Sequence, residues 1–145
     1  MNFVEVKGGR KTQRKYAESM VDFCIDMLGL GKIRTLDITV HFTNKTGDSE
    51  GLCCRVDDRE YEIEINKNLK LRTMLETIAH EMVHVKQYVR HELKEPTVWK
   101  GTNVDTDKVE YWDLPWEIEA HGREVGLFVR WAQKEGVWGK PWTYV

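Results

Sequence analysis

The sequence predicts an α+β fold in which helices cover a short antiparallel sheet of three to four strands. Apolar residues recur at helical spacing over residues 12–30, 69–88 and 115–134. Apolar and polar residues alternate with a period of two over residues 36–43, 52–56 and 61–65. A chain of 145 residues with 41% hydrophobic content can bury a core of its own, so residues 1–145 are expected to form a single domain.

The N-terminal part is expected to hold a helix followed by a strand. Residues 1–10 are a loose arm or a short strand that ends at Gly8-Gly9. Gly31 is expected to end the helix over 12–30, because glycine readily adopts the left-handed conformation of a helix end. The strand over 36–43 should turn His41 toward solvent and bury Leu36, Ile38, Val40 and Phe42.

Two further strands precede the second helix. The first should bury Leu52, Cys54 and Val56, and the second Tyr61, Ile63 and Ile65. With the strand over 36–43 they are expected to form an antiparallel meander. Cysteines are odd in number and lack zinc-ribbon spacing, so reduced and mostly buried thiols are expected at Cys24, Cys53 and Cys54.

The C-terminal third begins with a long connection over residues 92–112, with an additional strand expected around 97–100. Asp113 is a candidate cap for the helix over 115–134, and Pro115 suits its first turn, where a missing N–H costs nothing. Residues 137–144 form an aromatic tail that should pack back on the body.

The charge pattern narrows the class of partner. A formal net charge of −2 gives no support for a bulk nucleic-acid binder. Five cations do cluster near the N-terminus, where a solvated helix end is favoured over a phosphate-binding patch: Lys7, Arg10, Lys11, Arg14 and Lys15. The start lacks the apolar core of a signal peptide, and no apolar run approaches membrane-spanning length, so a cytoplasmic protein without a membrane partner is expected.

The clearest indication of a chemical function is the run His80-Glu81-Met82-Val83-His84. Residues four apart lie on one face of a helix, so His80 and His84 can direct two imidazole nitrogens at one metal ion. Glu81 then lies beside that ion as a candidate general base. The flanking residues are largely apolar, and polar groups on a buried helix need partners. The pattern therefore indicates a catalytic Zn²⁺ site.

A catalytic zinc needs a third protein ligand. The downstream candidates are His91, Glu117, Glu119, His121 and Glu124. His91 follows His84 by seven residues and would lie about 10 Å further along a continuous helix. The metzincin pattern fails because Gln87 and Arg90 stand where it needs glycine and histidine. The helix that begins at Pro115 is the better source.

His80-Glu81-x-x-His84 followed by Glu117-x-x-Ala120 on a second helix resembles the gluzincin group of zinc metallopeptidases. The chain is most similar to small soluble zincins of bacteria and their phages, such as the SprT-like and ImmA/IrrE-like proteins. The resemblance implies a minimal zincin fold, a Zn²⁺ ion held by His80, His84 and Glu117, and hydrolysis of a protein or peptide substrate in the cytoplasm, the host cytoplasm if the chain is phage-encoded.

Within that resemblance, Glu81 takes a proton from a zinc-activated water and delivers it to the leaving amine. Candidate donors to the developing oxyanion are Tyr111, His121 and Tyr88. His121 shares a helix face with Glu117 and Glu124, so it is also a candidate orienting group or ligand.

Further expectations concern the ligands' surroundings and the substrate. Glu76 or Asp113 is a candidate orienting group for a histidine ligand. Glu119 and Arg123 are spaced as a surface pair, and a peptide could add to the sheet beside residues 61–65. Two other functions stay open: a regulatory binding module of phage or toxin–antitoxin type, and a DNA-associated protease recruited through the N-terminal cations.

Overall fold

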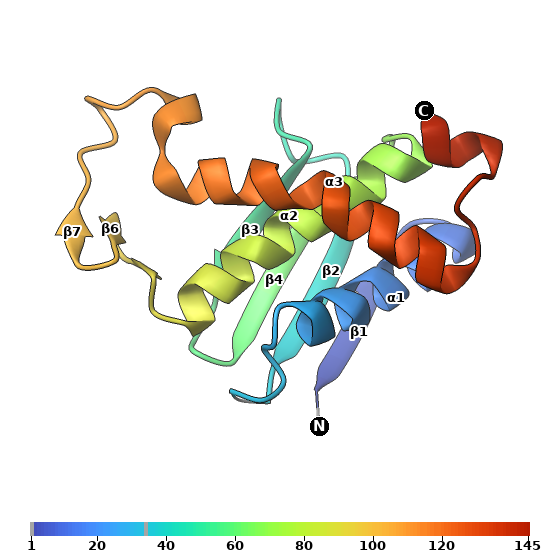
Figure 1. The fold of residues 1–145 in the computed structure, drawn as a ribbon, viewed down its shortest axis with the longest axis horizontal. Helices are drawn as coiled ribbons and strands as arrows, with labels where there is room; N and C mark the ends of the chain where they lie inside the picture. The colour runs from blue at the N-terminus through green and yellow to red at the C-terminus, as the bar shows by residue number, and fades with distance from the viewer. Residues whose placement is uncertain (1, 34) are drawn as a thin grey trace.

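The computed structural model describes residues 2–33 and 35–145, and it has the α+β architecture that the sequence predicts (Figure 1). Its main sheet comprises β1 (Phe3–Lys7), β2 (Asp37–Thr43), β3 (Gly51–Arg55) and β4 (Glu60–Asn66). A small second sheet comprises β5 (Leu93–Lys94), β6 (Val98–Trp99) and β7 (Thr102–Asn103). The α-helices are α1 (Lys11–Met27), α2 (Leu71–Val89) and α3 (Pro115–Glu135), and the 3₁₀ turns are η1 (Tyr111–Asp113) and η2 (Pro141–Tyr144).

The main sheet is mixed, so the predicted antiparallel meander is wrong. Its strand order is β1-β2-β4-β3, and only β3 runs antiparallel to its neighbour. The N-terminal residues form the edge strand β1, which pairs in parallel with β2 through the crossover helix α1. Alternation in sequence identifies the buried face of a strand but leaves its neighbours and their directions open.

The buried face of the sheet matches the predicted alternation in β2 and β4. Six of their side chains lie in the core: Ile38, Val40, Phe42, Tyr61, Ile63 and Ile65. In β3 the prediction is wrong, because Cys53 packs on the core whereas Leu52, Cys54 and Val56 are exposed. Cys53 stands directly opposite Ile63 in the antiparallel register, and opposed residues share a face of the sheet.

This order also corrects the expected place for an added peptide strand. β4 lies between β2 and β3, so both of its edges are already paired. The edge beside α2 belongs to β3. Gly51 begins β3 and permits a close approach there, since a Cβ built on it would lie 2.7 Å from Thr77 Cγ2 on α2.

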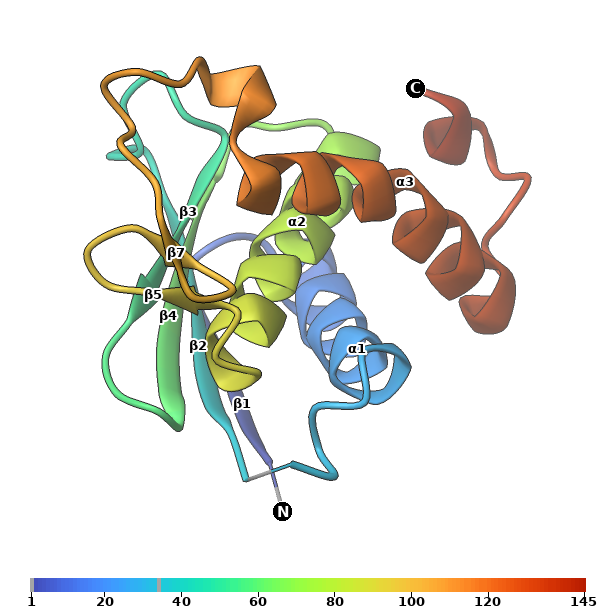
Figure 2. The ribbon, with the colours of Figure 1, turned by 60° about the vertical axis from the view of Figure 1, so that its left-hand side comes forward.

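The helices form two layers on one face of the sheet. Figure 2 shows α1 and α2 beside the sheet, and α3 crossing α2 on its far side. α1 ends near Leu28, and the left-handed glycine is Gly29 rather than the predicted Gly31. Because α2 is enclosed between sheet and α3, most of its residues are buried, as predicted. Among residues 2–33 and 35–145, no helix combines the length and apolar character needed to span a bilayer.

Residues 92–110 form an arm between α2 and α3, which carries β5, β6 and β7 (Figure 1). β6 occupies the segment where a strand was predicted. The arm has its own small apolar cluster, in which Leu93, Leu114 and Trp116 are buried. The N-cap of α3 is Leu114, so Asp113 is not the cap, although Pro115 stands in the first turn as predicted.

The aromatic tail packs on the body only in part. Trp142 contacts the main core and stacks 5.7 Å from Tyr16, and Val137 is buried. Trp138 and Tyr144 remain exposed. The three cysteines are free thiols, but only Cys24 is fully buried and Cys54 is exposed, which corrects the expectation that most are buried.

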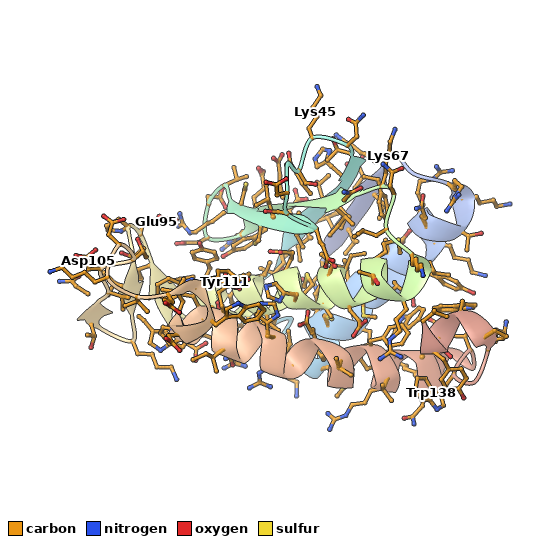
Figure 3. The ribbon with its side chains drawn as sticks, turned by 90° about the horizontal axis from the view of Figure 1, so that it is seen from above. Lys45, Lys67, Glu95, Asp105, Tyr111 and Trp138 are labelled. Atoms are coloured by element: carbon orange, nitrogen blue, oxygen red, sulfur yellow. The ribbon has the colours of Figure 1, made fainter. Side chains whose placement is uncertain are left out.

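The clustered N-terminal cations lie at the carboxyl end of β1 and in the first turns of α1, and all five are exposed. Figure 3 places Lys45 and Lys67 on the same side of the molecule, and the Lys67 carbonyl accepts a hydrogen bond from Gln13 at the start of α1.

Candidate metal centre

Two histidines on α2 and one glutamate on α3 converge at the contact between these helices. His80 and His84 stand one turn apart, with ring centroids 4.9 Å apart and both side chains nearly buried. Glu117 lies in the first turn of α3, and the fully buried Ala120 lets that helix approach α2 closely. The geometry thus brings together three residues separated by up to 37 positions in the chain.

The two distances from Glu117 to the motif histidines suit ligands of a shared ion. Glu117 Oε1 lies 3.0 Å from His80 Nε2 and 3.3 Å from His84 Nε2. Two ligands about 2.0–2.1 Å from a tetrahedral Zn²⁺ stand about 3.4 Å from each other. Nitrogen and oxygen donors of this kind are the usual ligands of a catalytic zinc, so the residues present fit the ion.

A second ligand set overlaps the first. Ligand atoms of His80, Glu117 and His121 all lie within 4.8 Å of one another, and the rings of His80 and His121 are 4.4 Å apart. His80 and Glu117 belong to both ligand sets. The third ligand is His84 in the first set and His121 in the second. In the predicted set, His80 Nε2 and His84 Nε2 both contact the same Glu117 oxygen, whereas the mutual 4.8 Å limit is met by the set that contains His121.

Electrostatic interactions among these side chains shift their pKa values. Burial opposes protonation of His80, but its hydrogen bond to Glu117 and the nearby carboxylates of Glu124 and Glu81 outweigh it and raise the pKa of His80 to about 10. Burial acts to raise the pKa of the Glu117 carboxyl, yet its hydrogen bonds to both histidines hold that pKa well below the usual range. Glu117 is therefore a carboxylate, as a metal ligand must be.

Glu81 lies beside these groups with a different environment. Its side chain is 5% exposed and takes part in no hydrogen bond or ion pair among the described residues. Burial raises the pKa of its carboxyl, and the two histidines oppose that shift only in part. A carboxylate with free lone pairs beside the ligands is suited to accept and release a proton.

Tyr111 and His121 complete the exposed rim. The Tyr111 hydroxyl donates to Glu117 Oε1 at 3.1 Å and lies 3.0 Å from His121 Nε2. Figure 3 shows Tyr111 beside the N-terminal end of α3, turned toward α2. Burial and the neighbouring Glu117 raise the pKa of Tyr111, so it keeps its proton at neutral pH. Tyr88, the third predicted donor, lines the same cavity as Tyr111, together with Leu93.

The orienting groups differ from those predicted. Gln87 is fully buried, and its Oε1 lies 2.8 Å from His84 Nδ1. Glu124 Oε2 lies 3.4 Å from His80 Nδ1, and its other oxygen lies 2.8 Å from His121 Nδ1. Glu76 instead pairs with Arg72, and Asp113 is exposed in η1. The signal for Gln87 was its spacing of three from His84 on a buried helix.

Gln87 is itself held by α3. Its Nε2 donates to the Trp116 carbonyl at 2.9 Å and to Glu119 Oε1 at 3.0 Å. Glu119 forms the predicted pair with Arg123 at 3.0 Å, but it also contacts Lys86 Nζ at 2.6 Å. The expected surface pair is therefore part of a network that joins α2 to α3 behind His84.

This network yields a prediction for Gln87→Leu. The variant keeps the side-chain volume but removes the contact that fixes the His84 ring, so zinc affinity should fall roughly 10- to 100-fold. Competition with a chromogenic chelator measures the change. Gln133→Leu, at an exposed position on α3, is the matched control and should bind zinc like the wild type. Equal affinities in the two variants would contradict an orienting role for Gln87.

Comparisons of the chain with known protein families, with curated proteins and with solved structures gave no match.

Proposed function

We propose that this protein is a zinc-dependent metallopeptidase with His80, His84 and Glu117 as its metal ligands. The observation that carries the proposal is the convergence of both imidazole Nε2 atoms of the His80-Glu81-x-x-His84 motif on one oxygen of Glu117. A buried glutamate with free lone pairs beside them supplies the base that hydrolysis requires. This arrangement supports the gluzincin resemblance of the sequence.

In the proposed hydrolysis, the ion and the protein's side chains would have separate roles. A bound Zn²⁺ supplies a Lewis acid that polarises the scissile carbonyl and lowers the pKa of water to about 7. The Glu81 carboxylate takes the proton of the attacking water and delivers it to the leaving amine nitrogen. The Tyr111 hydroxyl, protonated at neutral pH, is the nearest donor for the oxyanion. His121 holds that hydroxyl from the other side and is in turn held by Glu124.

The substrate is expected to lie along β3. This strand is the free edge of the sheet beside α2, and residues from its start and middle line the cavities that contain Glu81. An extended peptide can add to such an edge through main-chain hydrogen bonds. Its scissile bond would then face the α2–α3 contact.

Metal analysis together with an activity assay tests the proposal. Elemental analysis of the purified protein should find one zinc per chain. Peptide hydrolysis should disappear after chelation and return when zinc is restored, while magnesium should fail to restore it, because nitrogen-rich sites favour zinc. A wild-type protein that binds no zinc even after zinc is added would contradict the proposal and favour the regulatory binding module.

A further inference from the structure

Two cavities adjoin the candidate metal centre, and they differ in chemistry. Both are lined by His80 and Glu81. The first, about 260 Å³, is walled on one side by Leu52, Cys53, Tyr88, Leu93 and Trp116. The second, about 470 Å³, is lined by Asp48, Glu50 and Glu124 with Trp112, and none of the lysines and arginines that the structure describes lines it. Beyond the residues that the two cavities share, the first is therefore lined mainly by apolar side chains, and the second adds three carboxylates.

The acidic cavity is suited to a cationic side chain. Asp48 and Glu50 are exposed, and Glu50 accepts one hydrogen bond, from Thr77 Oγ1 at 3.3 Å. The Trp112 ring is 68% exposed and lies 4.8 Å from the His121 ring. An aromatic face beside carboxylates attracts an ammonium or guanidinium group. The buried Glu81 carboxylate, which has no partner of its own among residues 2–33 and 35–145, faces the same cavity.

The direction of β3 determines which cavity each half of a bound peptide would meet. Asp48 and Glu50, which precede β3, line the acidic cavity; Gly51 lines both cavities, and Leu52 and Cys53 line only the apolar one. Antiparallel pairing is the slightly more stable mode of strand addition. A peptide added in this way runs in the opposite direction, so its N-terminal half passes the apolar cavity and its C-terminal half passes the acidic one.

We propose that the site selects peptides with an apolar residue before the scissile bond and lysine or arginine directly after it. The inference rests on the proposed function and names its substrate class. Leu93 and Trp116 form walls around the residue before the scissile bond. Asp48 and Glu50 recognise the residue after it.

The first test compares three short peptides that differ only at the two central positions: Leu-Lys, Leu-Gln and Lys-Leu. With the zinc-loaded full chain, kcat/KM for Leu-Lys should exceed that for Leu-Gln roughly tenfold, as expected of two partly screened ion pairs. Lys-Leu should be the poorest. In Asp48→Asn/Glu50→Gln the ratio of Leu-Lys to Leu-Gln should fall close to one. Glu5→Gln/Asp37→Asn changes the total charge equally at the far edge of the sheet and should keep the ratio.

A binding measurement separates this inference from the proposed hydrolysis. Fluorescence anisotropy with labelled peptides and zinc-loaded Glu81→Gln should show tighter binding of Leu-Lys than of Leu-Gln, lost when Asp48→Asn/Glu50→Gln is added. Cleavage or binding without a preference for lysine, or with one that survives the double substitution, would overturn the inference and leave the peptidase standing. Selective binding without cleavage by the wild type would overturn the peptidase and support the cavity assignment.

Discussion

The Glu81→Gln variant is expected to lose peptide hydrolysis by roughly a thousandfold or more while it keeps its zinc. A positioned general base contributes typically 10²–10⁴-fold, and glutamine cannot accept the proton of the attacking water. The fold should persist because the amide has nearly the same volume as the carboxyl. Burial already disfavours a charge at this position, as the raised pKa of Glu81 shows, so a neutral side chain costs little there.

Three measurements check this expectation on the same preparation. Steady-state hydrolysis gives kcat, elemental analysis gives zinc per chain, and thermal unfolding gives Tm, which should change by no more than a few degrees. Glu62→Gln removes a charge from an exposed position on β4 and serves as the matched control with wild-type turnover. Retained turnover in Glu81→Gln would remove Glu81 from the mechanism.

The Glu117→Ala variant is expected to lose zinc, whereas His121→Ala is expected to keep it. Glu117 is the one carboxylate whose oxygen contacts both motif histidines, so its removal leaves two ligands of the predicted set. The loss should exceed the roughly 10- to 100-fold effect typical of an orienting group, and a fall in affinity of at least about a thousandfold is expected. His121 lies one turn further along α3, and the Tyr111 hydroxyl joins it to Glu117.

Competition with a chelator of known affinity measures both variants, and circular dichroism of the chelated proteins separates loss of metal from loss of fold. Zinc retained in Glu117→Ala and lost in His121→Ala would move the third ligand to His121. Zinc lost in both variants would instead favour the second ligand set, which contains Glu117 as well as His121. Chelated Glu117→Ala should also unfold at a lower temperature, because it leaves both buried histidines without their acceptor.

Local patterns in the sequence predicted the elements better than their arrangement. The alternation over residues 36–43 and 61–65 identified the buried faces of β2 and β4, since a period of two depends on the strand alone. The order β1-β2-β4-β3 depends on which strands meet in three dimensions, and the turn residues do not encode it. For the same reason Cys53, whose face is set by pairing with Ile63, was assigned to the wrong side.

The sequence likewise predicted the local parts of the candidate site better than the contacts between its helices. His80, Glu81 and His84 follow from helical geometry within five residues. The contact of Glu117 with both histidines requires α3 to cross α2, which the sequence indicated only through the spacing of Glu117 and Ala120. Gln87 belongs to no motif, and its role emerges only when the Trp116 carbonyl and Glu119 approach it from α3.

The arm over residues 92–110 leaves α2 shortly after His84 and returns to α3 shortly before Glu117. Its strands are two residues long, and of the three buried residues in the small cluster only Leu93 lies within 92–110, so little holds the arm apart from its two ends. An ion held by His84 and Glu117 would act as a cross-link that closes this loop of about 34 residues. By chain entropy such a closure stabilises the folded state by roughly 3–4 kcal/mol. The ligand that enables catalysis would then also restrict the unfolded chain, and the arm that forms one wall of the apolar cavity would gain order when the ion binds.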